Sequence, residues 1–149
     1  MRIATILPYK ENYTISKAQA AAIWVSDFFK YSKYKNQTFI YGNTTTNDYL
    51  TKNYINIKIN NLGSKFASTT REYCNNFIKK TKKKKFDIIE IHNRPEVFNL
   101  LKKEFNSKFV LYFHNDPLSM YGSKSSKERL KLLINLDKIV FISKWVQDR

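Results

Sequence analysis

Two stretches of the sequence, FDIIEIHNRPE at residues 86–96 and FVLYFHNDP at residues 109–117, share one pattern. Each begins with an apolar run of strand length and changes to polar residues at a His-Asn pair, which starts at His92 in the first stretch and at His114 in the second. Short apolar runs rich in Ile, Val and aromatic residues, followed by turn residues, predict buried strands. His92 and His114 are the only histidines in the chain. Both histidines therefore stand at the end of a predicted strand.

Further strands and helices are predicted on both sides of this pair. The strands are expected at residues 2–8, 37–42, 54–59, 87–91, 109–113 and 138–143. Helices are expected to begin at capping residues or at a proline in the first turn. These starting signals are Ser16 with Gln19, Thr69 with Glu72 (for a helix through Lys82), Pro95, Ser125 with Glu128, and Ser143. The resulting order predicts an α/β fold with a Rossmann-like, doubly wound, mostly parallel sheet of about six strands, covered on both faces.

Apolar residues at helical spacing predict which side of two helices faces the sheet. For the first helix these residues are Ile23, Trp24, Phe28 and Tyr31. For the helix after Pro95 they are Val97, Leu100, Leu101 and Phe105.

The composition is that of one globular domain. The chain has 149 residues, 42% of them hydrophobic and 15% aromatic, which suits a single packed core. A single cysteine, Cys74, excludes an internal disulfide and a cysteine-built zinc site. No apolar run is long enough for a secretory signal or a membrane span.

The charge is strongly basic, with 27 Lys and Arg against 12 Asp and Glu, a formal net charge of +15. Such a balance favours anionic partners: nucleic acid, phosphorylated metabolites or an anionic membrane face. Much of the excess lies in the lysine run KKTKKKK at residues 79–85. We interpret this run as a solvated helix end, because cations are favoured near a helix C-terminus, and prefer that reading to a dedicated binding patch.

The two His-Asn pairs are expected to meet in space. In an open parallel sheet, ligands bind outside the carboxyl ends of the strands. If the strands before His92 and His114 are neighbours, both histidines line one crevice there. Histidine and asparagine also cap helices and satisfy backbone groups at strand ends, so each pair alone has a purely structural interpretation. Two such His-Asn pairs after successive strands favour a functional site over a purely structural one. Imidazole exchanges protons near neutrality, and the planar guanidinium of Arg94 suits a phosphate or carboxylate.

Other chemistries find weaker support. The chain has no G-x-x-x-x-G-K-[ST] phosphate loop, no G-x-G-x-x-G after its first strand and no G-x-S-x-G elbow. Metal binding by His92, His114 and Asp116 matches no established ligand spacing, and we predict neither a metal nor a cofactor.

The chain resembles the N-terminal domain of GT-B fold glycosyltransferases, specifically glycosyltransferase family 4. The resemblance covers nearly the whole chain. It rests on ILPYKENYTISKAQAAAI at 6–23, DIIEIHNRPE at 87–96, FVLYFHNDP at 109–117, MYGSKSSKERLKLL at 120–133 and DKIVFISKWVQDR at 137–149. Family members often carry glycine at the start of the first helix, whereas residues 17–20 contain none.

The resemblance implies one half of a two-domain enzyme. Residues 1–149 would form the acceptor-side domain of a retaining, metal-independent glycosyltransferase. A second domain, which is not part of these 149 residues, would hold the nucleotide-sugar donor, so this chain alone is expected to be inactive. The acceptor would be a cell-surface glycan or a lipid-linked glycan, as in lipopolysaccharide and other envelope polysaccharides. The expected location is cytoplasmic, with peripheral contact to the anionic inner membrane face.

The same resemblance assigns roles to individual residues. His114 matches a catalytic histidine near the reacting hydroxyl and the donor sugar. The predicted substrate-binding residues are His92, Asn93 and Arg94 on the acceptor side, Asn115 and Asp116 beside the catalytic histidine, and Lys10, Lys17 and Gln19 in a loop that approaches the donor phosphates.

Two alternatives stay open. The first is a basic α/β domain that binds nucleic acid without catalysis, which would need lysines and aromatic residues on one face; no RRM, KH or helix-turn-helix signature supports it, and we disfavour it. The second is another GT-B enzyme, such as a sugar-nucleotide epimerase.

Overall fold

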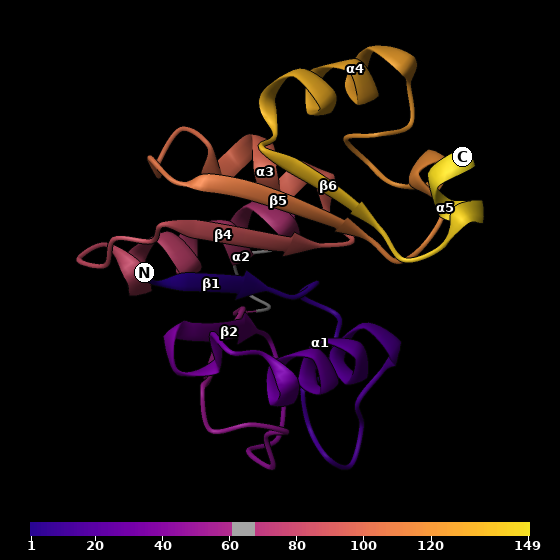
Figure 1. Ribbon diagram of the computed structural model, residues 1–149. Coiled ribbons are helices and arrows are strands. Elements are labelled where there is room, and N and C mark those ends of the chain that lie inside the picture. Colours follow the sequence, from indigo (N-terminus) through magenta and orange to yellow (C-terminus); the bar gives the residue numbers. More distant parts are fainter. Residues whose placement is uncertain (61–67) are drawn as a thin grey trace.

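One six-stranded, all-parallel sheet forms the centre of the protein in a computed structural model that describes residues 1–60 and 68–149 (Figure 1). The strands are β1 (Ile3–Ile6), β2 (Thr38–Gly42), β3 (Tyr54–Asn56), β4 (Ile88–His92), β5 (Lys108–Phe113) and β6 (Lys138–Phe141). Their spatial order is β3-β2-β1-β4-β5-β6, the order of a Rossmann-type doubly wound sheet. The predicted fold class is therefore confirmed, although β3 is shorter than the predicted strand 54–59.

Helices lie on both faces of the sheet. They are α1 (Ala20–Tyr31), α2 (Thr69–Thr81), α3 (Pro95–Leu101), α4 (Ser126–Asn135) and α5 (Lys144–Asp148), with short 3₁₀ turns η1 (Lys35–Gln37) and η3 (Pro117–Ser119). The larger apolar core joins α2 and α3 to the sheet through residues such as Phe77, Phe98 and Leu111. A smaller core joins α1 to β1 and β2 through Val25 and Ile40. None of the helices in the described residues is long and apolar enough to cross a bilayer.

Helix α1 begins three residues later than predicted, with Gln19 and not Ser16 at its N-cap, and without the expected capping box. Its N-cap is Gln19, whose side chain makes no capping hydrogen bond. The backbone N–H groups of Ala21 and Ala22 instead donate to the carboxylate of Glu11, at 3.1 and 3.2 Å. An anion at a helix N-terminus satisfies free N–H groups and interacts well with the helix dipole. The prediction of a Ser16–Gln19 cap is wrong because a carboxylate from the preceding loop already fills that place.

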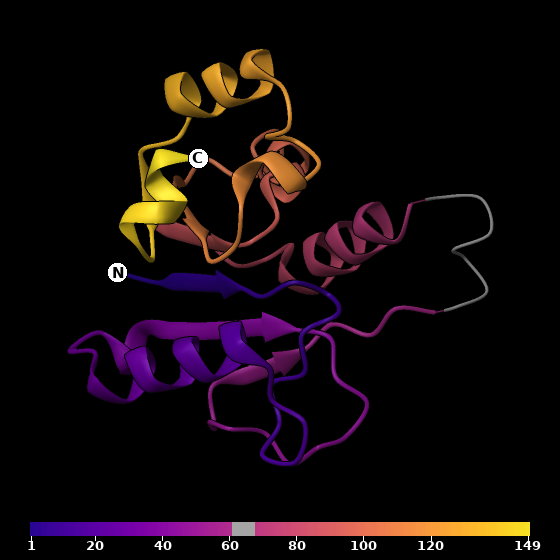
Figure 2. The same ribbon diagram turned by 90° about the vertical axis from the view of Figure 1, so that its right-hand side faces the viewer.

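The buried side of α1 also differs from the prediction. Its buried residues are the small or branched Ala21, Ala22, Val25 and Ser26. Of the four residues predicted to face the sheet, Ile23, Phe28 and Tyr31 are exposed, and only Trp24 is half-buried. Figures 1 and 2 show α1 beside β1 and β2, at the opposite end of the molecule from α4. On this side of the sheet α1 packs chiefly on β1–β3, and its Trp24 reaches the ends of β4 and β5. Side chains of β4–β6 on this face are half-exposed, so the described residues cover the second face only in part.

The remaining helix starts follow the sequence closely. Helix α2 is capped by the Ser68 hydroxyl, which accepts from the N–H of Arg71, so the predicted cap at Thr69 is one residue too late. Pro95 is the first residue of α3, as predicted, and Ser125 with Glu128 forms the predicted capping box of α4. The buried face of α3 includes Phe98, which was not predicted, while Leu100 and Phe105 are only half-buried. Ser143 caps α5 as predicted.

Candidate functional site

The two histidines meet at the carboxyl edge of the sheet. Strands β4 and β5 are neighbours, and His92 is paired in register with Tyr112, which places His114 one residue beyond the end of β5 at the same edge. The Nδ1 atom of His92 lies 2.8 Å from Nε2 of His114. The ring centroids are 5.1 Å apart. The expectation that the two His-Asn pairs meet in space is confirmed, but the apolar cavity described below is lined by His92 and not by His114.

Aromatic side chains enclose this histidine pair. The ring of His92 stacks on Tyr112, with centroids 4.5 Å apart and planes 4° from parallel. Trp24, from α1, meets His114 edge to face at 5.2 Å and lies 5.8 Å from His92. Stacked and edge-to-face arrangements of this kind are favourable, and they leave His92 buried and His114 half-buried. Helix α1 therefore supplies one wall of the site.

Burial keeps both imidazoles neutral. His92 is 1% exposed, and its pKa lies well below the ordinary value because burial disfavours the imidazolium and His114 adds repulsion. The pKa of the half-buried His114 is also lowered, by burial. A neutral imidazole carries one N–H and one acceptor nitrogen, so one ring donates to the other.

The shared hydrogen decides what His114 presents to a ligand. Its second nitrogen, Nδ1, has no hydrogen-bond partner among the described residues. When His92 is the donor of the pair, His114 carries its proton on Nδ1 and offers a donor; when His114 donates, Nδ1 is a free acceptor. Nε2 of His92 is buried and also lacks a partner in the described part of the chain. A proton accepted at Nδ1 of His114 therefore makes the pair cationic, because Nε2 of His92 has no partner among the described residues to which a proton could pass.

Asn93 holds the two strand exits together. Its backbone φ is 52°, in the left-handed region, which asparagine tolerates better than most residues. Its side-chain oxygen accepts from the backbone N–H groups of His114, at 2.8 Å, and Asn115, at 3.2 Å. The side-chain oxygen is thus already occupied by the backbone. Substrate binding by Asn93 stays a prediction.

Arg94 opens onto a separate, polar cavity of about 270 Å³. One guanidinium nitrogen donates to the Asn93 carbonyl at 2.8 Å, and the group lies 6.0 Å from the centre of the Tyr9 ring. The other lining residues are Thr70, Glu96, Asn115, Ser119, Met120 and Tyr121. The structure therefore brings the predicted Arg94 and Asn115 together, but in a cavity that His92 does not line.

Gly122 shapes one side of this cavity. Its φ is +89°, and a Cβ atom at this position would lie 2.9 Å from the backbone nitrogen of Glu96. Only glycine allows the loop after η3 to approach the start of α3 so closely. The loop that carries Tyr121 is consequently fixed against the helix that follows Arg94.

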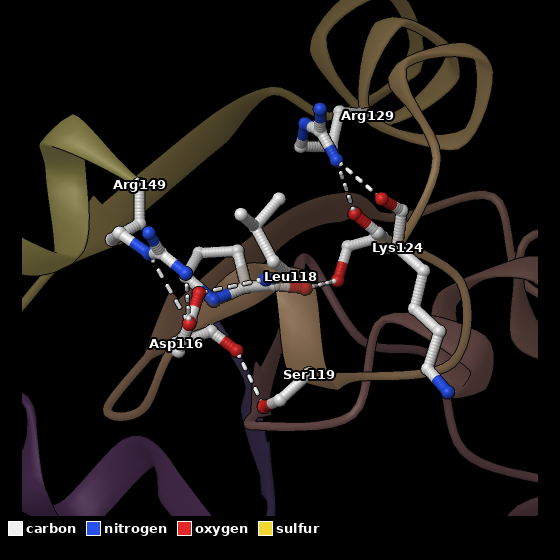
Figure 3. A network of polar contacts seen from close by, with 8 residues as sticks. Asp116, Leu118, Ser119, Lys124, Arg129 and Arg149 are labelled. Carbon is white, nitrogen blue, oxygen red and sulfur yellow. Dashed lines mark hydrogen bonds and ion pairs between the residues drawn. The ribbon is translucent and has the colours of Figure 1, made fainter.

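Asp116 belongs to a different network. Its carboxylate pairs with the guanidinium of Arg149 at 2.9 Å and accepts from the N–H of Leu118 at 2.9 Å (Figure 3). The bond from Arg149 is the main reason why the pKa of Asp116 lies below its usual value. Asp116 thereby ties the exit of β5 to α5. Substrate binding by Asp116 is an untested prediction.

The three residues predicted to approach a donor phosphate lie in the loop between β1 and α1. Lys10, Lys17 and Gln19 are exposed there. The N–H groups at the start of α1 that would receive a phosphate already bind Glu11. A donor phosphate at this place would have to displace that carboxylate. This is a second difference from the family pattern, beside the missing glycine at residues 17–20. The roles of the three residues stay predictions.

The sequence analysis missed an apolar cavity of about 290 Å³ that leads to His92 beneath α1. Trp24, Tyr112 and Glu90 are among its lining residues. Thr5 donates to the Glu90 carboxylate at 2.6 Å, and burial raises the pKa of Glu90. The two-residue period of a strand could have identified Glu90 and Tyr112 from the sequence. Each stands two residues before a histidine, so its side chain points to the same side of the sheet as that histidine.

Two further features bear on the predicted partners. The described residues contain no group of three or more His, Cys, Asp or Glu side chains placed to hold a metal ion. The lysine run 79–85 covers the end of α2 and the turn before β4, at the amino edge of the sheet and away from the histidine pair. Within the run, Lys80 donates to the carbonyl of Asn56, the last residue of β3, at 3.2 Å.

No protein-family model matches the chain, and no curated protein shows significant sequence similarity to it. The family resemblance therefore remains a prediction from the quoted motifs, and the functional argument depends on the geometry of the site.

Proposed function

We propose that this chain is the acceptor-side domain of a retaining glycosyltransferase that moves a sugar from a nucleotide-sugar to a glycan or lipid-linked acceptor. The observation that carries the proposal is the neutral His92–His114 pair at the carboxyl edge of the sheet. Ligand sites of open parallel sheets lie at this edge. A second domain would bring the donor sugar to this edge, and this domain alone would be inactive.

The proposed role of His114 is to stabilise the transfer of the sugar. The bond between the anomeric carbon and the leaving phosphate breaks, a bond to the acceptor oxygen forms, and the hydroxyl proton leaves. The free Nδ1 of His114 can donate to a sugar hydroxyl in one tautomer and accept the hydroxyl proton in the other. The hydrogen bond to His92 and the contact with Trp24 hold the ring in place, which preserves its orientation during the reaction.

Arg94 is proposed to hold the acceptor. Its planar guanidinium can bind a phosphate or carboxylate through two hydrogen bonds, and its cavity also presents polar groups of Asn115 and Ser119. Glu96 lies in the same cavity, so the anionic group of the acceptor is expected nearer to Arg94. No cofactor or metal is part of the proposal. We place the enzyme in the cytoplasm, where nucleotide-sugars supply cell-envelope polysaccharides and lipopolysaccharide.

The test is a transfer assay with the complete protein. A panel of nucleotide-sugars is offered with extracted lipid-linked glycans, and release of the nucleotide and growth of the acceptor are both measured. Acceptor-dependent release supports transfer. Conversion of the nucleotide-sugar to its epimer without acceptor would instead support an epimerase and would overturn the proposal.

The positions of the lysines and aromatic side chains give less support to the alternative, a basic domain that binds nucleic acid without catalysis. It needs lysines and aromatic residues on one binding face, whereas the lysine run 79–85 lies at the amino edge, and its Lys84 only approaches the Phe39 ring, at 5.9 Å.

A further inference from the structure

The apolar cavity beneath α1 holds a single carboxyl group among aromatic rings. Its volume of about 290 Å³ is close to the lower end for small-molecule sites, about 300–1,000 Å³. Among the described residues that line it, Glu90 alone carries a carboxyl group, and none is a lysine or an arginine. The lining residues of type Phe, Trp or Tyr are Trp24, Phe28, Phe29, Tyr34 and Tyr112.

The carboxyl group of Glu90 has only neutral partners. It accepts from the Thr5 hydroxyl at 2.6 Å and, more weakly, from the Tyr112 hydroxyl at 3.5 Å. None of the ion pairs within residues 1–60 and 68–149 includes Glu90. Met1 also lines the cavity, but its amino group lies 3.9 Å from the Asp87 carboxylate. A partly buried carboxylate without a cationic partner is unfavourable, so a cation that enters the cavity would reduce this cost.

The aromatic rings beside Glu90 add attraction for a cation. The Trp24 ring lies 5.5 Å from the ring of Tyr112 and stacks on Phe28 at 5.3 Å, with planes 4° from parallel. Glu90 and Tyr112 stand on the neighbouring strands β4 and β5 and joined by the hydroxyl contact, so the rings and the carboxyl group border the same space. The faces of aromatic rings attract ammonium groups, and the attraction increases when water is excluded.

We infer that this cavity binds a small organic ammonium ion, with the Glu90 carboxylate as its counter-ion and the rings of Trp24 and Phe28 against its carbon atoms. A metal ion is poorly suited, because hard cations require several oxygen ligands and this lining is mainly aromatic and aliphatic. An anionic ligand such as a phosphate would be repelled by Glu90. The inference does not depend on sugar transfer, since His114 does not line the cavity.

The test is a ligand-observed NMR titration of the complete protein with matched charged and uncharged probes. Choline is compared with 3,3-dimethylbutanol, in which a carbon atom replaces the charged nitrogen, and butylammonium is compared with butanol. Each pair has nearly the same shape, so a difference in Kd reports the charge.

Two variants and two controls separate the contributions of the carboxylate and the rings. Glu90→Gln keeps the shape of the side chain and removes its charge, and Phe28→Leu keeps an apolar side chain and removes the ring. Glu104→Gln removes the same charge at an exposed position, and Tyr31→Leu removes an exposed ring of α1, and neither residue lines the cavity. Circular dichroism and melting verify that all four variants fold.

We expect the wild type to bind both ammonium ions at least about tenfold more tightly than their uncharged counterparts. Glu90→Gln should remove most of this difference. Phe28→Leu should weaken ammonium binding by about threefold and change alcohol binding less, and both controls should bind like the wild type.

Three results would overturn the inference. They are equal binding of the ammonium ions and the alcohols, wild-type affinity in Glu90→Gln, and the lack of saturable binding for both ammonium ions. His114→Ala should still bind choline, so failure of the proposed transfer chemistry and failure of the cation site are distinguishable.

Discussion

Nδ1 of His92 and Nε2 of His114 lie 2.8 Å apart, although 21 residues separate the two in the chain. Adjacent parallel strands bring them together, Trp24 packs against both rings, and Tyr112 stacks on His92. A hydrogen bond between two imidazoles requires that at least one ring nitrogen be unprotonated. The chemistry open to this site therefore depends on the protonation state of the pair.

Both histidines should titrate below the ordinary histidine pKa of about 6.5. The folded pKa is lowered for both, by burial above all. The folded protein then resists protonation that the unfolded chain accepts, so stability is complete above about pH 6.5 and falls as the pH decreases below it. NMR of the two imidazole rings across this range provides the measurement. Titration of both rings at the ordinary value would contradict their burial.

Glu90→Gln should stabilise the protein at neutral pH. Burial raises the pKa of Glu90, so the folded state holds its proton at pH values where the unfolded chain has lost it. Stability consequently declines as the pH rises above about 4.3, the ordinary pKa of glutamate, because the unfolded chain ionises there while the folded carboxyl still holds its proton. Glutamine keeps the shape and removes the charge. Thermal melts at pH 7 and pH 4 should show an advantage of the variant that shrinks in acid; a less stable variant at pH 7 would show that the carboxylate is well solvated or paired.

Glu11→Ala should destabilise the protein by about 1 kcal/mol, the typical value of a helix N-terminal acceptor. The reason is the loss of two hydrogen bonds and of the favourable charge at the start of α1. Glu11→Gln is the matched control, because it keeps an acceptor oxygen and removes only the charge, and it should lose less. Chemical denaturation of the three proteins measures both effects. Equal stability of wild type and Glu11→Ala would mean that water replaces the carboxylate at no cost.

Gly122→Ala should cost about 1–3 kcal/mol, the range for a side chain forced into unfavourable backbone geometry. The added Cβ would meet the backbone of Glu96 at 2.9 Å, at a φ of +89°. Lys124→Ala, an exposed change in the same loop, should stay within about 0.5 kcal/mol. Urea denaturation compares the two variants, and an unchanged midpoint for Gly122→Ala would mean that the loop moves away from α3 without strain.

The sequence was sufficient to predict the sheet and the meeting of the two histidines. The apolar runs and their polar ends define the strands, and the helices between them require parallel neighbours. The caps at Ser125 and Ser143 were predictable because a capping residue acts within its own first turn.

Features that depend on distant contacts were not predictable in this way. Glu11 caps α1 from ten residues away, which no local capping pattern describes. The outward side of α1, with Phe28 and Tyr31, has the spacing of a buried face, but small residues pack against the sheet instead. Asp116 looks like a ligand in the sequence, yet its partner is Arg149, 33 residues further along the chain.

Acceptor binding is expected to depend on Arg94. Arg94→Ala should mainly raise the KM for an anionic acceptor and leave kcat nearly unchanged, because the guanidinium holds the acceptor equally before and during transfer. Arg71→Ala, an exposed change on α2, is the control. An unchanged KM for Arg94→Ala would place the acceptor outside the polar cavity.

The role of His114 in transfer is tested by the kinetics of His114→Ala in the complete protein, with the affinity for the donor measured by calorimetry. In the proposed mechanism the free Nδ1 of His114 lies at the reacting bond, where its hydrogen bond strengthens only during transfer. Loss of such a group should lower kcat by about 100-fold or more while the Kd for the nucleotide-sugar stays nearly unchanged. Near-normal turnover in the variant would show that His114 only supports the turn at the end of β5, and would contradict the proposed function of the histidine pair.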